Sequence, residues 1–150
     1  MNINTQFNEF YENIKLTKNQ KDDAKIKYDG VCQKLHNEYY PKEAYTGQSK
    51  LLIGSYGKHT NIRPPRDVDV LFIMPNDLYD KYNEYTSNGQ SQLLQDVKNI
   101  LSEKYSTTDR IKAWGKVILI EFSENVHNIE LLPAFKKNDG QFIIPNSEDG

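Results

Sequence analysis

The spacing of apolar residues changes near residue 49, and this change constrains the fold of the chain more than any other feature of its sequence. Before residue 49, apolar side chains recur every three or four residues, as on one face of a helix, at Ala24, Tyr28, Val31, Leu35 and Tyr39. Thr17 and Gln20 have the spacing of a capping box, and Pro41 cannot continue a helix. The sequence therefore predicts one long helix between Thr17 and Pro41.

Beyond residue 49, the apolar residues form short runs bounded by Gly, Pro and polar residues, which is typical of strands. The predicted strands are residues 51–53, 67–74, 110–114, 116–122 and 128–132, and residues 141–145 form a further extended segment. We expect the runs 116–122 and 128–132 to pair as a hairpin. A second helix is predicted from the helical spacing of Leu93, Leu94, Val97, Ile100 and Leu101.

The order of these elements predicts an α+β fold, in which N-terminal helices pack against one mixed, open sheet. A short helix beginning at Thr5 is expected before the long one, and the polar residues 76–89 are expected to form a loop. Trp114 is expected in the core, because an aliphatic strand follows it. His36 and His127 are expected at a helix face and in a hairpin loop, without a functional role.

Length and composition exclude several classes of protein. The 150 residues fit one domain, residues 1–150, and contain neither a run of 18 apolar residues nor the start of a secretory signal. The single cysteine, Cys32, excludes an internal disulfide, so a cytoplasmic location is the expectation. The formal net charge of −2 argues against general nucleic-acid binding. The polar turn at residues 146–150 suggests that the chain is the N-terminal part of a longer protein.

Asp67 and Asp69 are the first candidates for chemistry. Carboxylates two residues apart on a strand project from the same face and repel each other, while Val68 and Val70 take the opposite face toward the core. A divalent cation relieves this repulsion, and oxygen ligands of this kind suit Mg²⁺ or Mn²⁺. The alternative is an edge-strand charge pair that keeps the protein soluble.

A Gly54-Ser55 turn directly follows the first predicted strand. Glycine permits close backbone approach, and a serine at a helix start offers its hydroxyl and backbone amides to an anion. The turn is therefore a candidate site for the terminal phosphates of a nucleotide, although an ordinary strand-to-helix turn has the same residues.

The stretch from Gly54-Ser55-Tyr56 through Ile62-Arg63-Pro64 to Asp67-Val68-Asp69-Val70 resembles the signature of the polymerase-β-like nucleotidyltransferases. Its closer form is similar to the bacterial cGAS/DncV-like nucleotidyltransferases, whose catalytic domain is called SMODS. The resemblance covers about residues 25 to 146. It implies the polymerase-β-like nucleotidyltransferase fold and synthesis of cyclic di- or oligonucleotide second messengers in bacterial anti-phage defence.

The same resemblance implies a third carboxylate on a neighbouring strand, and Glu130 supplies it. It stands in Asn128-Ile-Glu-Leu-Leu-Pro-Ala-Phe135, which resembles the family segment that follows a carboxylate with two hydrophobic residues, Pro and Ala. Aspartate is the common residue at this position in the family, and glutamate is one methylene longer, so we expect either a different ligand geometry or a reduced activity here. Glu121, on the adjacent strand, is the alternative ligand.

For the site as a whole, the resemblance implies that Asp67, Asp69 and Glu130 hold two Mg²⁺ or Mn²⁺ ions. Gly54 and Ser55 would bind the phosphates of a nucleoside triphosphate, and Arg63 would either steady their charge or form a salt bridge that positions the carboxylates. An activating protein or ligand is a further expected partner. Nothing in the chain corresponds to the helical half that follows the catalytic core in this family.

Two other functions remain open from the sequence. In the first, the same chemistry transfers a nucleotide to a protein, an RNA end or a small molecule. In the second, the chain is a non-catalytic nucleotide-binding or partner-binding module that keeps the fold.

Overall fold

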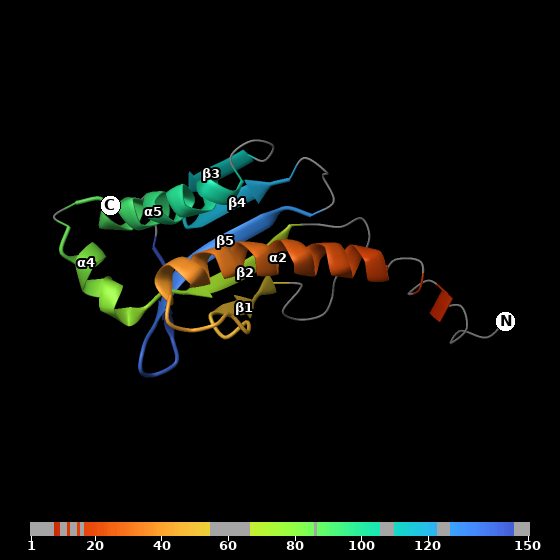
Figure 1. Cartoon of the computed structure of the whole chain (residues 1–150), viewed down its shortest axis with the longest axis horizontal. Coiled ribbons are helices and arrows are strands. Elements are labelled where there is room, and N and C mark those ends of the chain that lie inside the picture. The colour runs from red at the N-terminus through yellow and green to blue at the C-terminus, as the bar shows by residue number, and fades with distance from the viewer. Residues whose placement is uncertain are drawn as a thin grey trace.

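The computed structural model describes residues 8, 9, 12, 15, 17–54, 67–85, 87–105, 110–122 and 127–145. Two helices, α2 (Lys18–Tyr39) and α5 (Gly89–Lys104), lie across the same face of a sheet (Figure 1). Between β2 and α5 the chain forms the one-turn helix η1 (Asn76–Leu78) and the short helix α4 (Tyr79–Asn83). None of the helices in these ranges is both long and apolar enough to cross a membrane.

Six strands form the sheet in the described part of the chain, in the order β1-β2-β5-β4-β3, with β6 beside β5. Their bounds are Lys50–Leu52 (β1), Val68–Ile73 (β2), Arg110–Trp114 (β3), Val117–Glu121 (β4), Ile129–Lys136 (β5) and Phe142–Ile143 (β6). The central pair, β2 and β5, is parallel, and the other neighbours are antiparallel. The predicted mixed sheet and the predicted β4–β5 hairpin are thereby confirmed.

The long helix is also confirmed. Thr17 accepts a hydrogen bond from the Gln20 backbone N–H at 3.2 Å, and the Gln20 side chain accepts one from the Thr17 N–H at 2.8 Å. This capping box satisfies two of the N–H groups that a helix start leaves without partners. Helix α2 ends at Tyr39, directly before the segment that contains Pro41.

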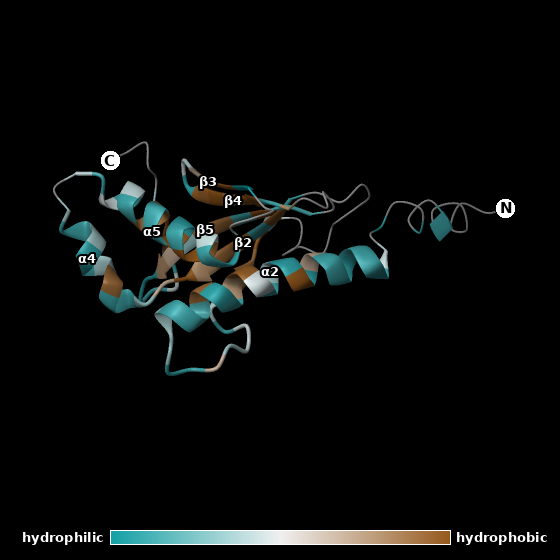
Figure 2. Cartoon of the chain, turned by 45° about the horizontal axis from the view of Figure 1, so that its top comes forward, coloured by the Kyte–Doolittle hydropathy of each residue, from teal (hydrophilic) through white to brown (hydrophobic). Residues whose placement is uncertain are grey.

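The core lies between the two helices and the sheet face they cover. Strand residues of this face are fully buried, and the buried residues of α2 and α5 pack against them, as the hydropathy colouring of Figure 2 shows for the strands. The strand residues are Val68, Val70, Phe72, Ile118, Ile120, Ile129 and Leu131. Because side chains alternate along a strand, the intervening residues lie on the opposite face, which we call the open face.

Strand β5 continues beyond its predicted end at Leu132, through Pro133. Proline lacks the N–H group that a central strand donates, so the sequence suggested an end there. The structure avoids this conflict, because the pairing with β4 ends at Leu131 and the pairing with β6 begins at Phe135. Pro133 therefore lies at a gap in the ladder on that side of β5.

Two predictions about loops and core were wrong. Residues 76–89 contain η1, α4 and the start of α5 rather than a loop alone, because Tyr79 packs edge-on against Phe135, with ring centroids 5.4 Å apart, and Tyr82 is buried. Trp114 is 75% exposed, not in the core, because β3 is an edge strand and Trp114 lies on its open face at the hairpin end. Of the short helix expected to begin at Thr5, residues 8, 9 and 12 are helical, and the remainder lies outside the described residues.

Candidate functional site

The three predicted carboxylates lie at the beginning of the central parallel strand pair. Asp69 on β2 is the register partner of Glu130 on β5, and Asp67 directly precedes β2. Val68 and Ile129, also register partners, are fully buried against the helices, so Asp67, Asp69 and Glu130 all lie on the open face. Asp69 and Glu130 are half-buried, and Asp67 is exposed. The topology thus brings together residues that stand 61 positions apart in the sequence.

These carboxylates oppose one another's ionisation. The hydrogen bond that the protonated Glu130 carboxyl donates to Asp69, its burial, and the negative charges of Asp69 and Asp67 together raise the pKa of Glu130 to about 7. A raised pKa of this kind marks a site where either a proton or a cation must offset the negative charge. All the donors are carboxylate oxygens, which fit Mg²⁺ or Mn²⁺. Within the described residues, no group of three or more His, Cys, Asp or Glu side chains is spaced as a formed metal site.

Gly54 approaches the carboxylates closely. It follows β1 with φ = 63°, a conformation that favours glycine, and a Cβ atom there would lie 2.7 Å from Asp69 Oδ2. The preceding residue, Ile53, donates its backbone N–H to the Asp69 carbonyl oxygen at 3.0 Å. The glycine turn and the carboxylate pair therefore form one site. Ser55 and Arg63, the other predicted phosphate-binding residues, lie outside the described residues.

Glu121, the alternative third ligand, is engaged elsewhere. It lies on the open face of β4, but the register partner of Glu130 on that strand is Leu119. The Glu121 carboxylate instead pairs with Arg110 at 3.7 Å and Lys112 at 3.9 Å, both on β3. Among the acidic residues on the strands, Glu130 is therefore the one that contacts Asp69.

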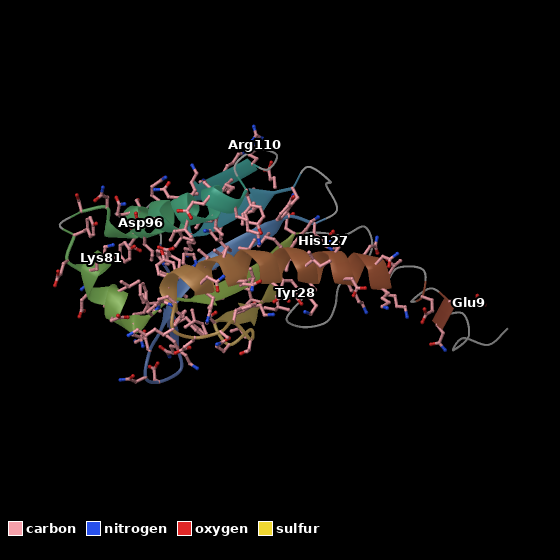
Figure 3. All side chains as sticks on the ribbon, viewed as in Figure 1. Glu9, Tyr28, Lys81, Asp96, Arg110 and His127 are labelled. Atoms are coloured by element: carbon pink, nitrogen blue, oxygen red, sulfur yellow. The ribbon has the colours of Figure 1, made fainter. Side chains whose placement is uncertain are left out.

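The structure also places a histidine without a predicted role next to this site. His127, three residues before Glu130, is 1% exposed and lies beside α2 (Figure 3). Its Nδ1 lies 3.0 Å from Asp23 Oδ2 on that helix. His127 lies in the connection between β4 and β5, where the sequence predicted a hairpin loop. No local pattern signals this contact, because the two residues are 104 positions apart.

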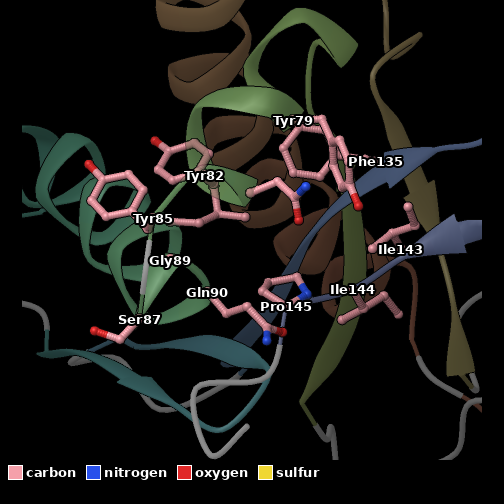
Figure 4. Close-up of a pocket in the computed structure, with 12 residues that line it drawn as sticks. Tyr79, Tyr82, Tyr85, Ser87, Gly89, Gln90, Phe135, Ile143, Ile144 and Pro145 are labelled. Atoms are coloured by element: carbon pink, nitrogen blue, oxygen red, sulfur yellow. The ribbon is translucent and has the colours of Figure 1, made fainter. Parts of the chain in front are cut away.

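A separate cavity of about 510 Å³ lies between α4, α5 and the end of β5 (Figure 4). Its walls combine aromatic and aliphatic residues, with Tyr79, Tyr82, Phe135 and Ile143 among them, and polar residues such as Asn83 and Gln90. Phe135 is five residues beyond Glu130 on β5, which is about 17 Å along a strand. This cavity is therefore distinct from the carboxylate site.

The fold is shared with solved structures, one of which is a cyclic AMP-GMP synthase. CdnC of E. coli MS115-1, in a complex with HORMA-deltaN, matches 95% of this chain at 16% identity, with a TM-score of 0.63. Vibrio cholerae DncV, a cyclic AMP-GMP synthase with a bound linear intermediate, matches 87% at 14% identity and a TM-score of 0.60. E. coli DncV bound to 3'-deoxy GTP matches 90% at 12% identity, also with a TM-score of 0.60.

The chain spans 46%, 47% and 53% of these three solved chains, about half their length. None of the curated proteins compared with the chain matches it. The likeness of the solved structures confirms the α+β nucleotidyltransferase fold. The model of the family described as the Second Messenger Oligonucleotide or Dinucleotide Synthetase domain, SMODS, matches residues 1–150, and the chain therefore belongs to this family of cGAS/DncV-like nucleotidyltransferases.

Proposed function

We propose that the protein containing this chain is a metal-dependent nucleotidyltransferase that joins nucleoside triphosphates into a cyclic di- or oligonucleotide. One observation supports this function above the others. In a chain of the SMODS family, Asp69 and Glu130 are register partners on adjacent parallel strands, and Gly54 contacts Asp69. A phosphate-binding turn beside paired carboxylates is the arrangement that phosphoryl-transfer chemistry requires.

Asp67, Asp69 and Glu130 would hold two Mg²⁺ or Mn²⁺ ions through their carboxylate oxygens. When bound, the cations supply charge neutralisation for the triphosphate and a lowered pKa for the attacking hydroxyl. Gly54 permits the backbone to approach the carboxylates, Ser55 would donate to the terminal phosphates, and Arg63 would face their negative charge. The protein's own contribution is therefore to place a triphosphate and an acceptor hydroxyl on the open face of the sheet.

In the proposed reaction, a ribose hydroxyl of one nucleotide forms a bond to the α-phosphorus of another. The bond between the α-phosphorus and the bridging oxygen breaks, pyrophosphate leaves, and the hydroxyl loses its proton. A second transfer within the linear product closes the ring. The solved relatives include a cyclic AMP-GMP synthase with a linear intermediate, which supports this order of steps.

Two further parts of the proposal rest on relatives. The complex of CdnC with HORMA-deltaN supports a protein activator as a partner, and the resemblance to defence enzymes supports a role in bacterial anti-phage signalling. We place the reaction in the cytoplasm, where nucleoside triphosphates and Mg²⁺ are available. Residues 1–150 would form the catalytic core.

Incubation with labelled nucleoside triphosphates and Mg²⁺ or Mn²⁺, followed by phosphatase treatment and chromatography, tests the proposal. We expect a phosphatase-resistant product that Asp67→Ala/Asp69→Ala abolishes. Glu121→Ala is the matched control, because it removes a carboxylate from the same face but outside the site, and it should retain the product. The assay requires the complete protein together with any activator.

Other outcomes separate the two alternative functions. Label recovered in protein, RNA or a small molecule, with the same dependence on Asp67 and Asp69, would identify a different acceptor. Nucleotide binding without turnover, under every activating condition, would identify a non-catalytic module. A phosphatase-resistant product that the double variant makes undiminished would overturn the assignment of the site.

A further inference from the structure

Three polar side chains meet where α2 crosses the start of β5. Asp23 Oδ2 lies 3.0 Å from His127 Nδ1 and 3.1 Å from Lys27 Nζ. The His127 side chain is fully buried and that of Lys27 is 7% exposed, whereas Asp23 is partly exposed. Polar groups at this depth are costly unless they are paired, so a cluster of this kind fixes the elements that carry it relative to one another.

Asp23 is the centre of this cluster. Its burial would raise the pKa of the carboxyl, but the hydrogen bond with His127 and the positive charge of Lys27 nearby hold the pKa below its ordinary value. Lys27 Nζ has no well-aligned hydrogen-bond partner in the described part of the chain, and it lies 5.0 Å from the centre of the Phe122 ring. The lysine therefore depends on the Asp23 charge and on the aromatic face.

The cluster is connected to the carboxylate site through the backbone. His127 is followed by Asn128, whose carbonyl oxygen accepts the Val68 N–H at 2.8 Å, the first bond between β5 and the β2 region in the described residues. The Asn128 side-chain oxygen also accepts the Phe122 N–H at 3.2 Å. Residue 128 thus joins the starts of β2 and β5, which carry Asp69 and Glu130, to the residue that directly follows the end of β4.

The two faces of the chain at the start of β5 contact different parts of the protein. His127 has the parity of Ile129, which faces the helices, and Asn128 has the parity of Glu130, which lies on the open face. A restraint applied to His127 from α2 therefore acts through one peptide unit on the strand pairing that sets Glu130 beside Asp69. The amino-acid sequence alone does not show this link, because Asp23 on α2 and Glu130 lie on opposite sides of the sheet.

We propose that Asp23, Lys27 and His127 form a positioning cluster that holds the start of β5 against α2 and thereby keeps Glu130 in place to share a cation with Asp69. The proposal rests on the proposed function, because it takes Asp69 and Glu130 as cation ligands. The three residues contact neither a nucleotide nor a cation in this scheme. They act only through the backbone of residues 127–130.

Mn²⁺ affinity, measured by titration calorimetry and electron paramagnetic resonance, tests this cluster independently of turnover. We expect His127→Phe to weaken Mn²⁺ binding about tenfold, as loss of a residue supporting the ligands does. His36→Phe is the matched control. His36 is also fully buried, and its ring nitrogens lie 2.9 Å from Ser49 Oγ and 3.0 Å from the Glu43 carbonyl oxygen.

Both histidine variants lose buried hydrogen bonds, so their free energies of unfolding should fall together, while only His127→Phe should lose Mn²⁺ affinity. A second pair of variants changes the side chains less and is therefore less prone to misfold. Asp23→Asn should weaken Mn²⁺ binding, and Asp29→Asn should not, although Asp29 also forms ion pairs from α2, with Lys25 and Lys50 at 2.9 and 2.8 Å. If the members of each pair lose Mn²⁺ affinity equally, the positioning role is refuted.

The failure of the proposed function has a different signature. In that case the unaltered protein and the Asp69→Ala variant would bind Mn²⁺ equally, or neither would bind it, and both proposals would be overturned. If Asp69→Ala removes Mn²⁺ binding, but His127→Phe and His36→Phe have the same Mn²⁺ affinity, only the proposal of the positioning cluster is overturned.

Discussion

Glu130 shows how one residue links the chemistry of the site to the stability of the fold. Its pKa lies near 4.5 in an unfolded chain and at about 7 in the folded protein without a cation, because of the Asp69 hydrogen bond, burial and the neighbouring negative charges. Between these two pH values the folded state binds more protons than the unfolded state. The contribution of Glu130 to stability therefore falls as the pH rises through this window.

We expect Glu130→Gln to stabilise the cation-free protein at pH 8, where the native glutamate is ionised beside Asp69. The gain should be about 1 kcal/mol, because solvent screens much of the repulsion at a partly exposed group. At pH 5 the gain should be smaller, since the folded glutamate is already protonated. Urea unfolding with a chelator present measures both values, and an equal effect at both pH values would contradict the carboxylate repulsion.

Gly54→Ala tests the contact between the turn and the carboxylates. The added Cβ would lie 2.7 Å from Asp69 Oδ2 and would displace the Asp69 carboxylate, so we expect Mn²⁺ affinity to fall about tenfold. Gly115→Ala is the control, because Gly115 has nearly the same backbone angle, φ = 59° against 63°, with nothing within 4 Å of its Cβ position. Both variants should lose about 1 kcal/mol of stability from backbone strain.

Equal Mn²⁺ affinities in the two glycine variants would show that the turn does not set the position of Asp69. Both substitutions cause the same kind of backbone strain, so a difference in Mn²⁺ affinity between the variants is due to the contact of residue 54 with Asp69.

The candidate site could be predicted from the sequence only in part. Gly54, Asp67 and Asp69 lie in one contiguous stretch, and Glu130 follows from the family resemblance of its own segment. The register between Asp69 and Glu130 required the fold, because it joins strands that are not consecutive in the chain. The contact of Asp23 with His127 had no sequence signal, since a single hydrogen bond between distant residues leaves no periodicity of its own.

At the scale of the elements, tertiary packing explains where prediction succeeded and failed. Helix α2 was predicted because its cap and its apolar stripe agree with each other, and β2 because a buried strand reads as an apolar run. Helix α4 was missed because its polar composition favours a loop, whereas the burial of Tyr82 and the contact of Tyr79 with Phe135 favour the helix. Packing of aromatic side chains overrode local propensity there.

Gly89→Ala tests the close packing of α4 against α5. Gly89 is the first residue of α5, and a Cβ there would overlap the backbone carbonyl oxygen of Tyr82. Because neither backbone segment yields as a flexible side chain would, we expect a loss of about 1–3 kcal/mol in the free energy of unfolding.

Gly30→Ala, in the middle of α2, provides the contrast. Its Cβ would meet only the ends of the Lys104 and Tyr105 side chains, each at 3.2 Å, and both can move. The higher helix propensity of alanine should leave this variant as stable as the native protein or up to about 1 kcal/mol more stable. Similar losses in both variants, measured by urea unfolding, would argue against the tight junction at Gly89.

At the scale of the whole molecule, the sheet separates two kinds of surface. One face is covered by α2 and α5 and carries the core, and the open face carries the carboxylates together with the exposed Trp114 and the Glu121 ion pairs. The prediction that Trp114 lies in the core was wrong, because the sequence of a single strand does not show whether that strand lies at the edge of a sheet. The α+β class was predictable, since it depends only on the order and periods of the elements.

The parallel pairing of β2 with β5 has a consequence for how the protein folds. Val68 meets Ile129 across 61 positions of sequence, so the central ladder forms only after a long loop has closed. Contacts of such high sequence separation slow folding and form together with the bulk of the structure. Asp69 and Glu130 therefore come together only once this loop has closed. A cation held between them would bind the folded chain and not the unfolded one, so it would raise the free energy of unfolding.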